Sequence, residues 1–216
     1  MAKRSRSSER WLQRQRRDAF VKRARRDGRV SRAHYKLQQL DERFKLLGKH
    51  SQVLELGAAP GGWTDYLGER LTEGRVIAVD PLPVTVSGNN IVVLDGRIGD
   101  PRIDAQLSEL LQDQGTGRKS GLDLVLSDMA PNISGVRVAD QARTMELVEL
   151  ATDAALEWLK PGGALVVKMT QGDGVETWLE QAKRHFAKVN LVKPAASRPD
   201  SRENYAVARG FRQQSR

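Results

Sequence analysis

The sequence predicts an α/β fold whose centre is a mostly parallel sheet of seven strands. Short apolar runs that are typical of buried strands recur along the chain, and segments with helical spacing of apolar residues lie between most of them. This alternation is typical of a parallel sheet that helices cover on both faces. Only residues 194–203, which include two prolines, separate the last two runs, so we expect these two strands to pair antiparallel.

The first half of the chain supplies four of the predicted strands. Its first helix begins near Ser31, whose hydroxyl can cap it, and ends at Gly48. The apolar face of that helix is formed by Ala33, Leu37, Leu40, Phe44 and Leu47. We then predict a strand at 52–57 that closes on glycine, strands at 75–80 and 122–128 that end in aspartate, a strand at 90–96, and helices at 62–71 and 103–113.

The second half begins with a long amphipathic helix at 139–159. The residues that share its apolar face are Leu147, Ala151, Ala154, Ala155 and Trp158. The sequence KPGG at 160–163 breaks this helix, and the apolar run GALVVKM at 163–169 predicts the fifth strand. A helix at 174–186 and strands at 188–193 and 204–210 complete the fold.

The positive charge is concentrated at the N-terminus. The 216 residues carry a formal charge of +9, yet residues 1–36 alone carry +11 and the remaining residues carry −2. We therefore divide the chain into a basic arm, residues 1–30, and a nearly neutral domain, residues 31–216. A basic arm on a neutral body indicates a polyanionic partner, nucleic acid before an anionic membrane.

The composition argues against disulfide bonds, metal sites and membrane segments. The chain has no cysteine, which excludes a disulfide framework and a cysteine-ligated metal site. Its histidines, His34, His50 and His185, lack metal-ligand spacing, so we expect no metal. It has neither an apolar run long enough to cross a bilayer nor an apolar signal-peptide core. We expect a cytoplasmic monomer with no membrane partner.

The residues that carry chemistry cluster at the ends of the predicted strands. In open α/β sheets, ligands bind beyond the carboxyl ends of the strands. That rule brings Gly57, Asp80, Asp95, Asp128 and Lys168 to one edge. Lys168 ends an apolar run, and an ammonium there is costly unless it is paired or hydrated.

The glycine turn ELGAAPGGW at 55–63 indicates a nucleoside ligand. It follows the first strand and opens a helix, but it reads G-A-A-P-G-G, without the middle glycine that makes room for a pyrophosphate. Pro60 also removes a backbone donor. A nucleoside without a diphosphate therefore fits better than NAD. Asp80, at the end of the second strand, can accept hydrogen bonds from ribose hydroxyls.

Together the motifs resemble the FtsJ-like family of S-adenosylmethionine-dependent RNA ribose methyltransferases. The resemblance rests on SRAHYKL, ELGAAPGGW, SDMAPN, VVKMTQG and SRENYAVA, which occur in the family's order over about residues 30–210. It implies the Rossmann-like methyltransferase fold, with a seven-stranded sheet whose last strand is antiparallel. It also implies S-adenosylmethionine as methyl donor, a uridine 2′-hydroxyl as acceptor, and bacterial 23S ribosomal RNA of the large subunit as partner.

The resemblance also implies which residues form the site. The family's catalytic Lys-Asp-Lys-Glu tetrad falls on Lys36, Asp128, Lys168 and Glu203. The implied cofactor-binding residues are Gly57, Gly61, Gly62, Trp63, Asp80, Asp95 and Asp128. Asp95 is our choice for the adenine side, with Asp100 as the alternative, because this chain reads Leu-Asp-Gly where the family often has Gly-Asp.

Methylation of a ribose hydroxyl requires charged side chains such as those of this tetrad. A ribose hydroxyl is a poor nucleophile while protonated, so a group must remove its proton or stabilise the developing alkoxide. We expect Lys168 to be the central catalytic group, oriented by Asp128 and Glu203, with Lys36 completing the network. A neutral Lys168 would act as base and a charged one as stabiliser, and the sequence leaves both open. Other readings are a ribose methyltransferase for transfer RNA or another RNA, an inactive RNA-binding or ribosome-assembly protein on this scaffold, and an NAD enzyme.

Overall fold

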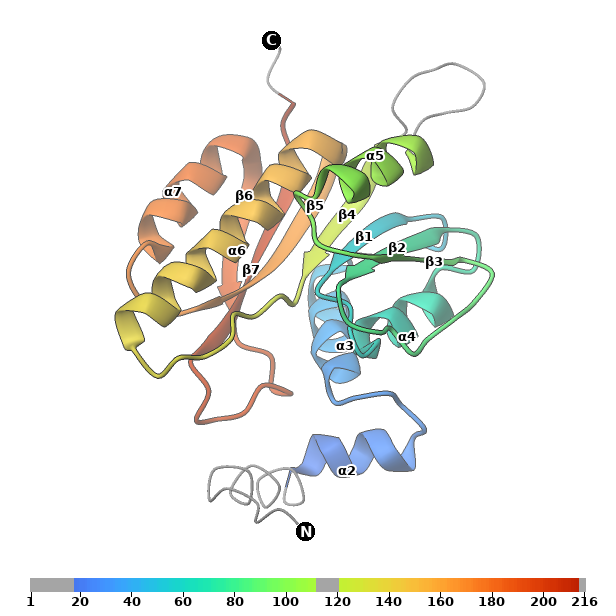
Figure 1. Cartoon of the computed structure of the whole chain (residues 1–216), viewed down its shortest axis with the longest axis horizontal. Coiled ribbons are helices and arrows are strands. Elements are labelled where there is room, and N and C mark those ends of the chain that lie inside the picture. The colour runs from blue at the N-terminus through green and yellow to red at the C-terminus, as the bar shows by residue number, and fades with distance from the viewer. Residues whose placement is uncertain (1–17, 112–120, 214–216) are drawn as a thin grey trace.

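The structure is a computed structural model that describes residues 18–111 and 121–213. Its centre is one seven-stranded sheet with the strand order β3-β2-β1-β4-β5-β7-β6 (Figure 1). The strands are β1 (Gln52–Leu56), β2 (Arg75–Asp80), β3 (Ile91–Asp95), β4 (Leu122–Ser127), β5 (Leu159–Thr170), β6 (Phe186–Val192) and β7 (Glu203–Phe211).

The pairing of the strands confirms the predicted sheet. The five strands from β3 to β5 are mutually parallel. Strand β7 inserts between β5 and β6 and is antiparallel to both. The short connection between β6 and β7 leaves no room for a crossover helix, which is why the chain reverses there.

Helices cover both faces of the sheet and bury two apolar cores. The described helices are α2 (Ala19–Arg26), α3 (Ala33–Phe44), α4 (Gly62–Arg70), α5 (Pro101–Leu110), α6 (Arg137–Trp158) and α7 (Val175–His185), of which α2 packs outside these two cores. Helices α3 and α4 pack on one face, and α5, α6 and α7 pack on the other. Alternate residues of a central strand serve opposite cores, as with Val53 and Leu54 of β1. None of the described helices is long and apolar enough to cross a membrane.

Helix α3 ends earlier than predicted. We expected it to run to Gly48, but its last helical residue is Phe44, and Lys45 takes the left-handed conformation with φ of 53°. The carboxylate of Asp41 accepts the backbone N–H groups of Leu46 and Leu47 at 2.9 and 3.0 Å. This side-chain cap ends the helix three residues before the glycine. At the other end, the hydroxyl of Ser31 accepts the N–H of Ala33 at 3.2 Å.

Helix α6 buries a slightly different face from the predicted one. Val148 is fully buried where we expected Leu147, which is only half-buried. The helix ends at Trp158, and β5 begins at once with Leu159, so the KPGG sequence lies within the bounds of the strand. Of the predicted basic arm, residues 1–17 lie outside the described residues, as do the last two residues of the helix predicted at 103–113.

Candidate active site

The carboxyl ends of the parallel strands bring the predicted site residues to one edge. In the register of the sheet, Leu56 lies beside both Val79 and Ser127, and Ser127 lies beside Val167. The residues that follow these positions are Gly57, Asp80, Asp128 and Lys168. Asp95 lies beside Asp80 on the outer strand. The sheet therefore places all five strand-end residues along the edge that the sequence predicted.

Two ion pairs form the centre of this edge. The Nζ atom of Lys168 lies 3.0 Å from Oδ1 of Asp128, and the same ammonium donates a hydrogen bond to the backbone carbonyl of Asp128. The Nζ atom of Lys36, from α3, lies 2.8 Å from Oε1 of Glu203, from the start of β7. All four side chains are mostly buried. We expected Glu203 to orient Lys168, but the contact that the structure gives it is with Lys36.

The hydroxyl of Tyr205 joins the two ion pairs. It donates a hydrogen bond to Oδ1 of Asp128 at 2.7 Å and accepts one from Nζ of Lys36 at 3.2 Å. The sequence interpretation did not include this residue. A signal was present, because residues two apart on a strand point to the same face, and Tyr205 follows Glu203 by two. Glu203 is also held from outside the tetrad, by a 2.8 Å hydrogen bond from the Ser197 hydroxyl.

The charges and burial in this cluster shift the pKa of Asp128 and of Tyr205. Burial acts to raise the pKa of Asp128, but the charges of Lys168 and Lys36 and the hydrogen bond from Tyr205 outweigh it, so the pKa falls below its ordinary value. Burial and the neighbouring carboxylates of Asp128 and Glu203 raise the pKa of Tyr205 well above its ordinary value. Asp128 is therefore an ionised acceptor at neutral pH, and Tyr205 is a neutral phenol that donates to it.

The glycine turn packs directly against the segment that follows Asp128. Gly57 has a φ of 76°, and a Cβ atom there would come within 2.7 Å of the backbone nitrogen of Met129. Gly61 has a φ of 115° and precedes the first residue of α4, Gly62, where a Cβ would meet the Ser31 hydroxyl. The turn therefore requires glycine for reasons of backbone shape and close packing.

The predicted cofactor acids differ in how they are engaged. The buried carboxylate of Asp80 accepts the backbone N–H of Ala59 at 3.0 Å and that of Leu82 at 2.8 Å, which fixes the turn. Asp100 accepts the N–H of Arg102 as the N-cap of α5. The side chain of Asp95 is exposed at the edge. Asp100 is exposed as well, so the two acids considered for the adenine side differ in that the Asp100 carboxylate is engaged as a helix cap.

Trp63 lies in the core beneath the site. Its indole N–H donates to the carbonyl of Ala33 at 2.9 Å, and its ring packs 5.7 Å from that of Tyr205. The side chain is almost completely buried. This placement couples α3, α4 and β7 and leaves little of the indole to meet a ligand.

A buried carboxyl group that the sequence interpretation missed lies under the glycine turn. Glu55 of β1 accepts a 2.8 Å hydrogen bond from the hydroxyl of Thr64, and both side chains are buried. Burial raises the pKa of Glu55 to about 8, against the lowering effect of Thr64, and the charges of Asp128 and Asp80 raise it further. Glu55 is therefore protonated at neutral pH.

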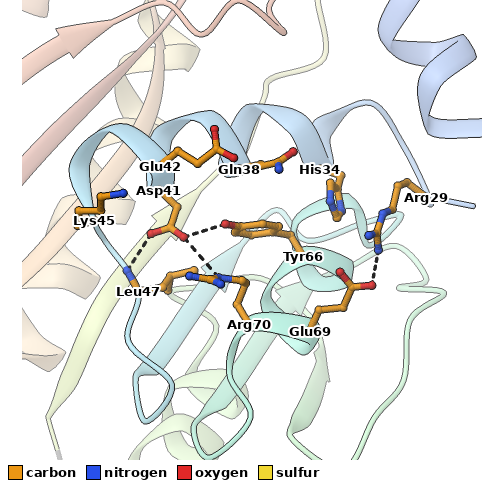
Figure 2. Close-up of a pocket in the computed structure, with 10 residues that line it drawn as sticks. All are labelled: Arg29, His34, Gln38, Asp41, Glu42, Lys45, Leu47, Tyr66, Glu69 and Arg70. Atoms are coloured by element: carbon orange, nitrogen blue, oxygen red, sulfur yellow. Dashed lines mark hydrogen bonds and ion pairs between the residues drawn. The ribbon is translucent and has the colours of Figure 1, made fainter. Parts of the chain in front are cut away.

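A cavity of about 330 Å³ lies between α3 and α4, away from this edge (Figure 2). Its lining charges neutralise one another: Arg29 pairs with Glu69, and Arg70 lies 3.7 Å from Asp41. None of the predicted site residues lines it. We therefore take the edge of the sheet, and not this cavity, as the candidate active site.

Comparison with known proteins points to one family. A model of the FtsJ-like methyltransferase family matches residues 29–211. Ribosomal RNA large subunit methyltransferase E from Stutzerimonas stutzeri (strain A1501) is 48% identical over 211 residues, which cover 97% of this chain and 99% of that protein. The protein of the same name from Stenotrophomonas maltophilia (strain K279a) is 44% identical over 213 residues, 98% of each chain.

Solved structures agree on the fold. A crystal structure described as a ribosomal RNA methyltransferase from Plasmodium falciparum has a TM-score of 0.72 at 29% identity, over 84% of this chain and 97% of its own. A methyltransferase from Streptococcus mutans in complex with SAH has a TM-score of 0.50 at 14% identity, over 77% and 90%, a likeness of fold alone. The chain has the Rossmann-like methyltransferase fold and belongs to the FtsJ-like methyltransferase family.

Proposed function

We propose that this protein transfers a methyl group from S-adenosylmethionine to the ribose 2′-hydroxyl of a uridine in 23S ribosomal RNA of the large subunit. The observation that carries the proposal is the presence of two ion pairs, Lys36–Glu203 and Lys168–Asp128, at the carboxyl edge of the sheet. Their residues come from distant segments of the chain. The names of relatives that align over nearly the whole chain support the choice of ribosomal RNA.

The neighbouring turn fits the proposed methyl donor. Bound there, S-adenosylmethionine would supply a methyl group already activated by a sulfonium. The carboxylate of Asp80 accepts two backbone N–H groups of the turn and has acceptor capacity left for ribose hydroxyls. Asp95 would face the adenine. We assign no direct cofactor contact to Trp63, because its side chain is engaged in the core.

Lys168 acts on the acceptor oxygen. Its Nζ atom lies 3.0 Å from the carboxylate of Asp128, whose lowered pKa keeps that carboxylate ionised. We propose that the ammonium donates a hydrogen bond to the 2′ oxygen and stabilises the charge that develops as the methyl carbon bonds to it. The methyl carbon would leave the sulfonium sulfur, which becomes a neutral thioether, and the hydroxyl proton would pass to water. Lys36 and Glu203 hold the opposite side of the site through Tyr205.

The described part of the basic arm supports an RNA acceptor. Asp18 caps α2 and also pairs with Arg32 of the α3 segment and Arg198 of the loop that precedes Glu203. This anchoring holds α2 on the same side of the molecule as the active edge (Figure 1). The exposed Lys22, Arg25 and Arg26 could there neutralise phosphates beside the site.

The proposal is tested by labelled methyl transfer. Purified protein and S-adenosylmethionine are incubated separately with large subunits, free 23S RNA and transfer RNA from cells that lack the enzyme, and the methylated nucleotide is mapped. We expect a 2′-O-methyluridine in 23S RNA. Methylation of transfer RNA alone, or RNA binding without methyl transfer, would favour the two alternative functions instead.

Replacement of Lys168 tests its role. We expect Lys168→Ala to lower kcat by at least about a hundredfold while S-adenosylmethionine binding by calorimetry stays near normal. Lys188→Ala, an exposed lysine on β6, is the matched control and should keep full activity. Lys168→Arg retains a positive donor that cannot accept a proton, so partial activity there supports stabilisation, and near-normal turnover of Lys168→Ala would refute the assignment.

A further inference from the structure

An exposed apolar ridge stands beside the active edge. Ile133, Val136 and Val138 are 75%, 61% and 76% exposed, three of the four highest values among the large apolar residues that the structure describes; the fourth is Leu82 at 66%. They lie on the connection from β4 to α6 and on the first turn of α6. We call these three residues the β4–α6 ridge. Apolar side chains so fully exposed and so close together in the chain mark a surface that a partner covers.

The ridge is held in one shape. The carboxylate of Asp140 accepts hydrogen bonds from the backbone N–H and the hydroxyl of Ser134 at 2.8 and 2.7 Å, and from the N–H of Gly135 at 3.0 Å. The Ser134 hydroxyl also accepts the N–H of Val136 at 3.2 Å. These bonds fix the connection that carries the ridge, so the apolar side chains are presented to solvent by a folded structure.

The ridge is tied to the catalytic residues at both ends. The connection starts directly after Asp128, whose neighbour Met129 packs against the glycine turn. At the other end, Gln141 of α6 is joined to Thr170 by a 2.8 Å hydrogen bond between their side chains. Thr170 follows Lys168 by two residues on β5. The connection that carries the ridge therefore adjoins the segments that hold Asp128 and Lys168.

The charge around the ridge matches a polyanion. Arg137 lies between two of its members, and the guanidinium of Arg143 lies 3.5 Å from the carbonyl of Asn132. Both arginines are exposed, whereas Asp140, the acid among them, is engaged with the loop backbone. Exposed cations next to exposed apolar side chains suit nucleic acid, in which phosphates alternate with apolar base faces.

We propose that the β4–α6 ridge binds unstacked bases of the RNA next to the target ribose, with Arg137 and Arg143 on the flanking phosphates. The inference rests on the proposed function and names the surface that would hold its substrate. Apolar side chains can insert against base faces and hold a nucleotide out of its stack. Lys168 is mostly buried at the edge, and a nucleotide held out of its stack can approach it without the rest of the RNA helix.

The test replaces the ridge with polar residues. The variant Ile133→Ser/Val136→Ser/Val138→Ser changes exposed positions only, and Leu150→Ser/Leu191→Ser changes exposed apolar residues of α6 and β6 as the control. Binding of a fluorescent, protein-free transcript of 23S RNA is measured by anisotropy, and methylation is measured with the same transcript and with intact subunits. We expect the ridge variant to lose about tenfold or more in RNA affinity and in kcat/KM, with unchanged S-adenosylmethionine binding and unchanged kcat at saturating RNA.

Each other outcome overturns the inference. Unchanged affinity for the transcript would mean that the ridge does not touch RNA. A loss with intact subunits but not with the transcript would assign the ridge to a ribosomal protein, and a change in sedimentation of the free enzyme would assign it to a second copy of the chain. If the triple variant does not fold, RNA binding and methylation are measured with Ile133→Ser alone, and the same outcomes decide. Anisotropy needs no methyl transfer, so the ridge can bind RNA even if the proposed reaction fails.

Discussion

The buried carboxyl of Glu55 makes the stability of this protein depend on pH in a direction that can be measured. Burial, with a smaller contribution from the charge of Asp128, raises its pKa from 4.5 to about 8. Between these two values the folded protein keeps one proton that the unfolded chain has released. The free energy of unfolding therefore falls as pH rises, by about 1.4 kcal/mol per pH unit. The full contribution of Glu55 is present below pH 4.5 and is lost as pH rises through about 8.

The variant Glu55→Gln isolates this contribution. Glutamine has nearly the same size, stays neutral at every pH, and its amide oxygen can accept the hydroxyl of Thr64. The variant should therefore gain stability over the wild type as pH rises. Between pH 4.5 and pH 7 the gain in the free energy of unfolding amounts to at most about 3 kcal/mol, and by pH 8 to about 4 kcal/mol.

Urea unfolding at pH 5, 6, 7 and 8, at constant ionic strength, measures the difference between the two proteins. Taking the difference cancels the groups that titrate alike in both. The exposed Glu149 supplies the control, since Glu149→Gln should leave the slope of stability against pH unchanged. A wild-type minus variant difference that does not change with pH would refute the reasoning, because it would mean that Glu55 is ionised within the fold.

Three further predictions follow from contacts at the same edge. Tyr205→Phe removes a buried hydroxyl that donates to the ionised Asp128, so kcat should fall by roughly 10- to 100-fold, the equivalent of about 1.5–3 kcal/mol, with unchanged S-adenosylmethionine affinity by calorimetry. Gly57→Ala places a Cβ 2.7 Å from the backbone of Met129 at a φ of 76°, and urea unfolding should show a loss of about 1–3 kcal/mol; an unchanged midpoint would contradict the assigned turn. Asp18→Ala removes the N-cap of α2 and breaks the ion pairs of Asp18 with Arg32 and Arg198. Limited proteolysis should then begin between residues 18 and 30, while the midpoint of global unfolding moves little.

The sheet could be predicted from the sequence because its signals are local. Each strand is a short apolar run, and the residue that ends it is glycine, an acid or lysine. Once the strands are parallel, their ends must share an edge, so the placement of Asp80 and Asp95 on one edge followed without knowledge of any side-chain contact, whereas their adjacency depends on the strand order.

The details that depend on contacts between distant segments could not be predicted. The end of α3 is set by where the Asp41 carboxylate finds backbone donors, and a glycine three residues later looked like the better stop. The pairing within the tetrad is set by which ammonium lies nearer to each acid. The order of the four residues in the chain does not reveal which lysine pairs with which acid. The role of the Tyr205 hydroxyl depends on three separate elements, which bring it between Lys36 and Asp128.

The pairing divides the tetrad into two halves with different neighbours. Asp128 and Lys168 adjoin the glycine turn, because Met129 packs on Gly57. Lys36 and Glu203 adjoin the arm, because Ser197 holds Glu203, and the next residue, Arg198, pairs with Asp18.

We infer that the first half acts where the methyl donor and the acceptor oxygen meet, and that the second half holds the RNA beside it. The Tyr205 hydroxyl is the contact through which the position of one half constrains the other. A variant that breaks this link should then impair the alignment of two bound substrates more than the binding of either. Kinetically, that means a fall in kcat with little change in either KM, whereas a tyrosine that merely packed the core would lower stability and leave kcat intact.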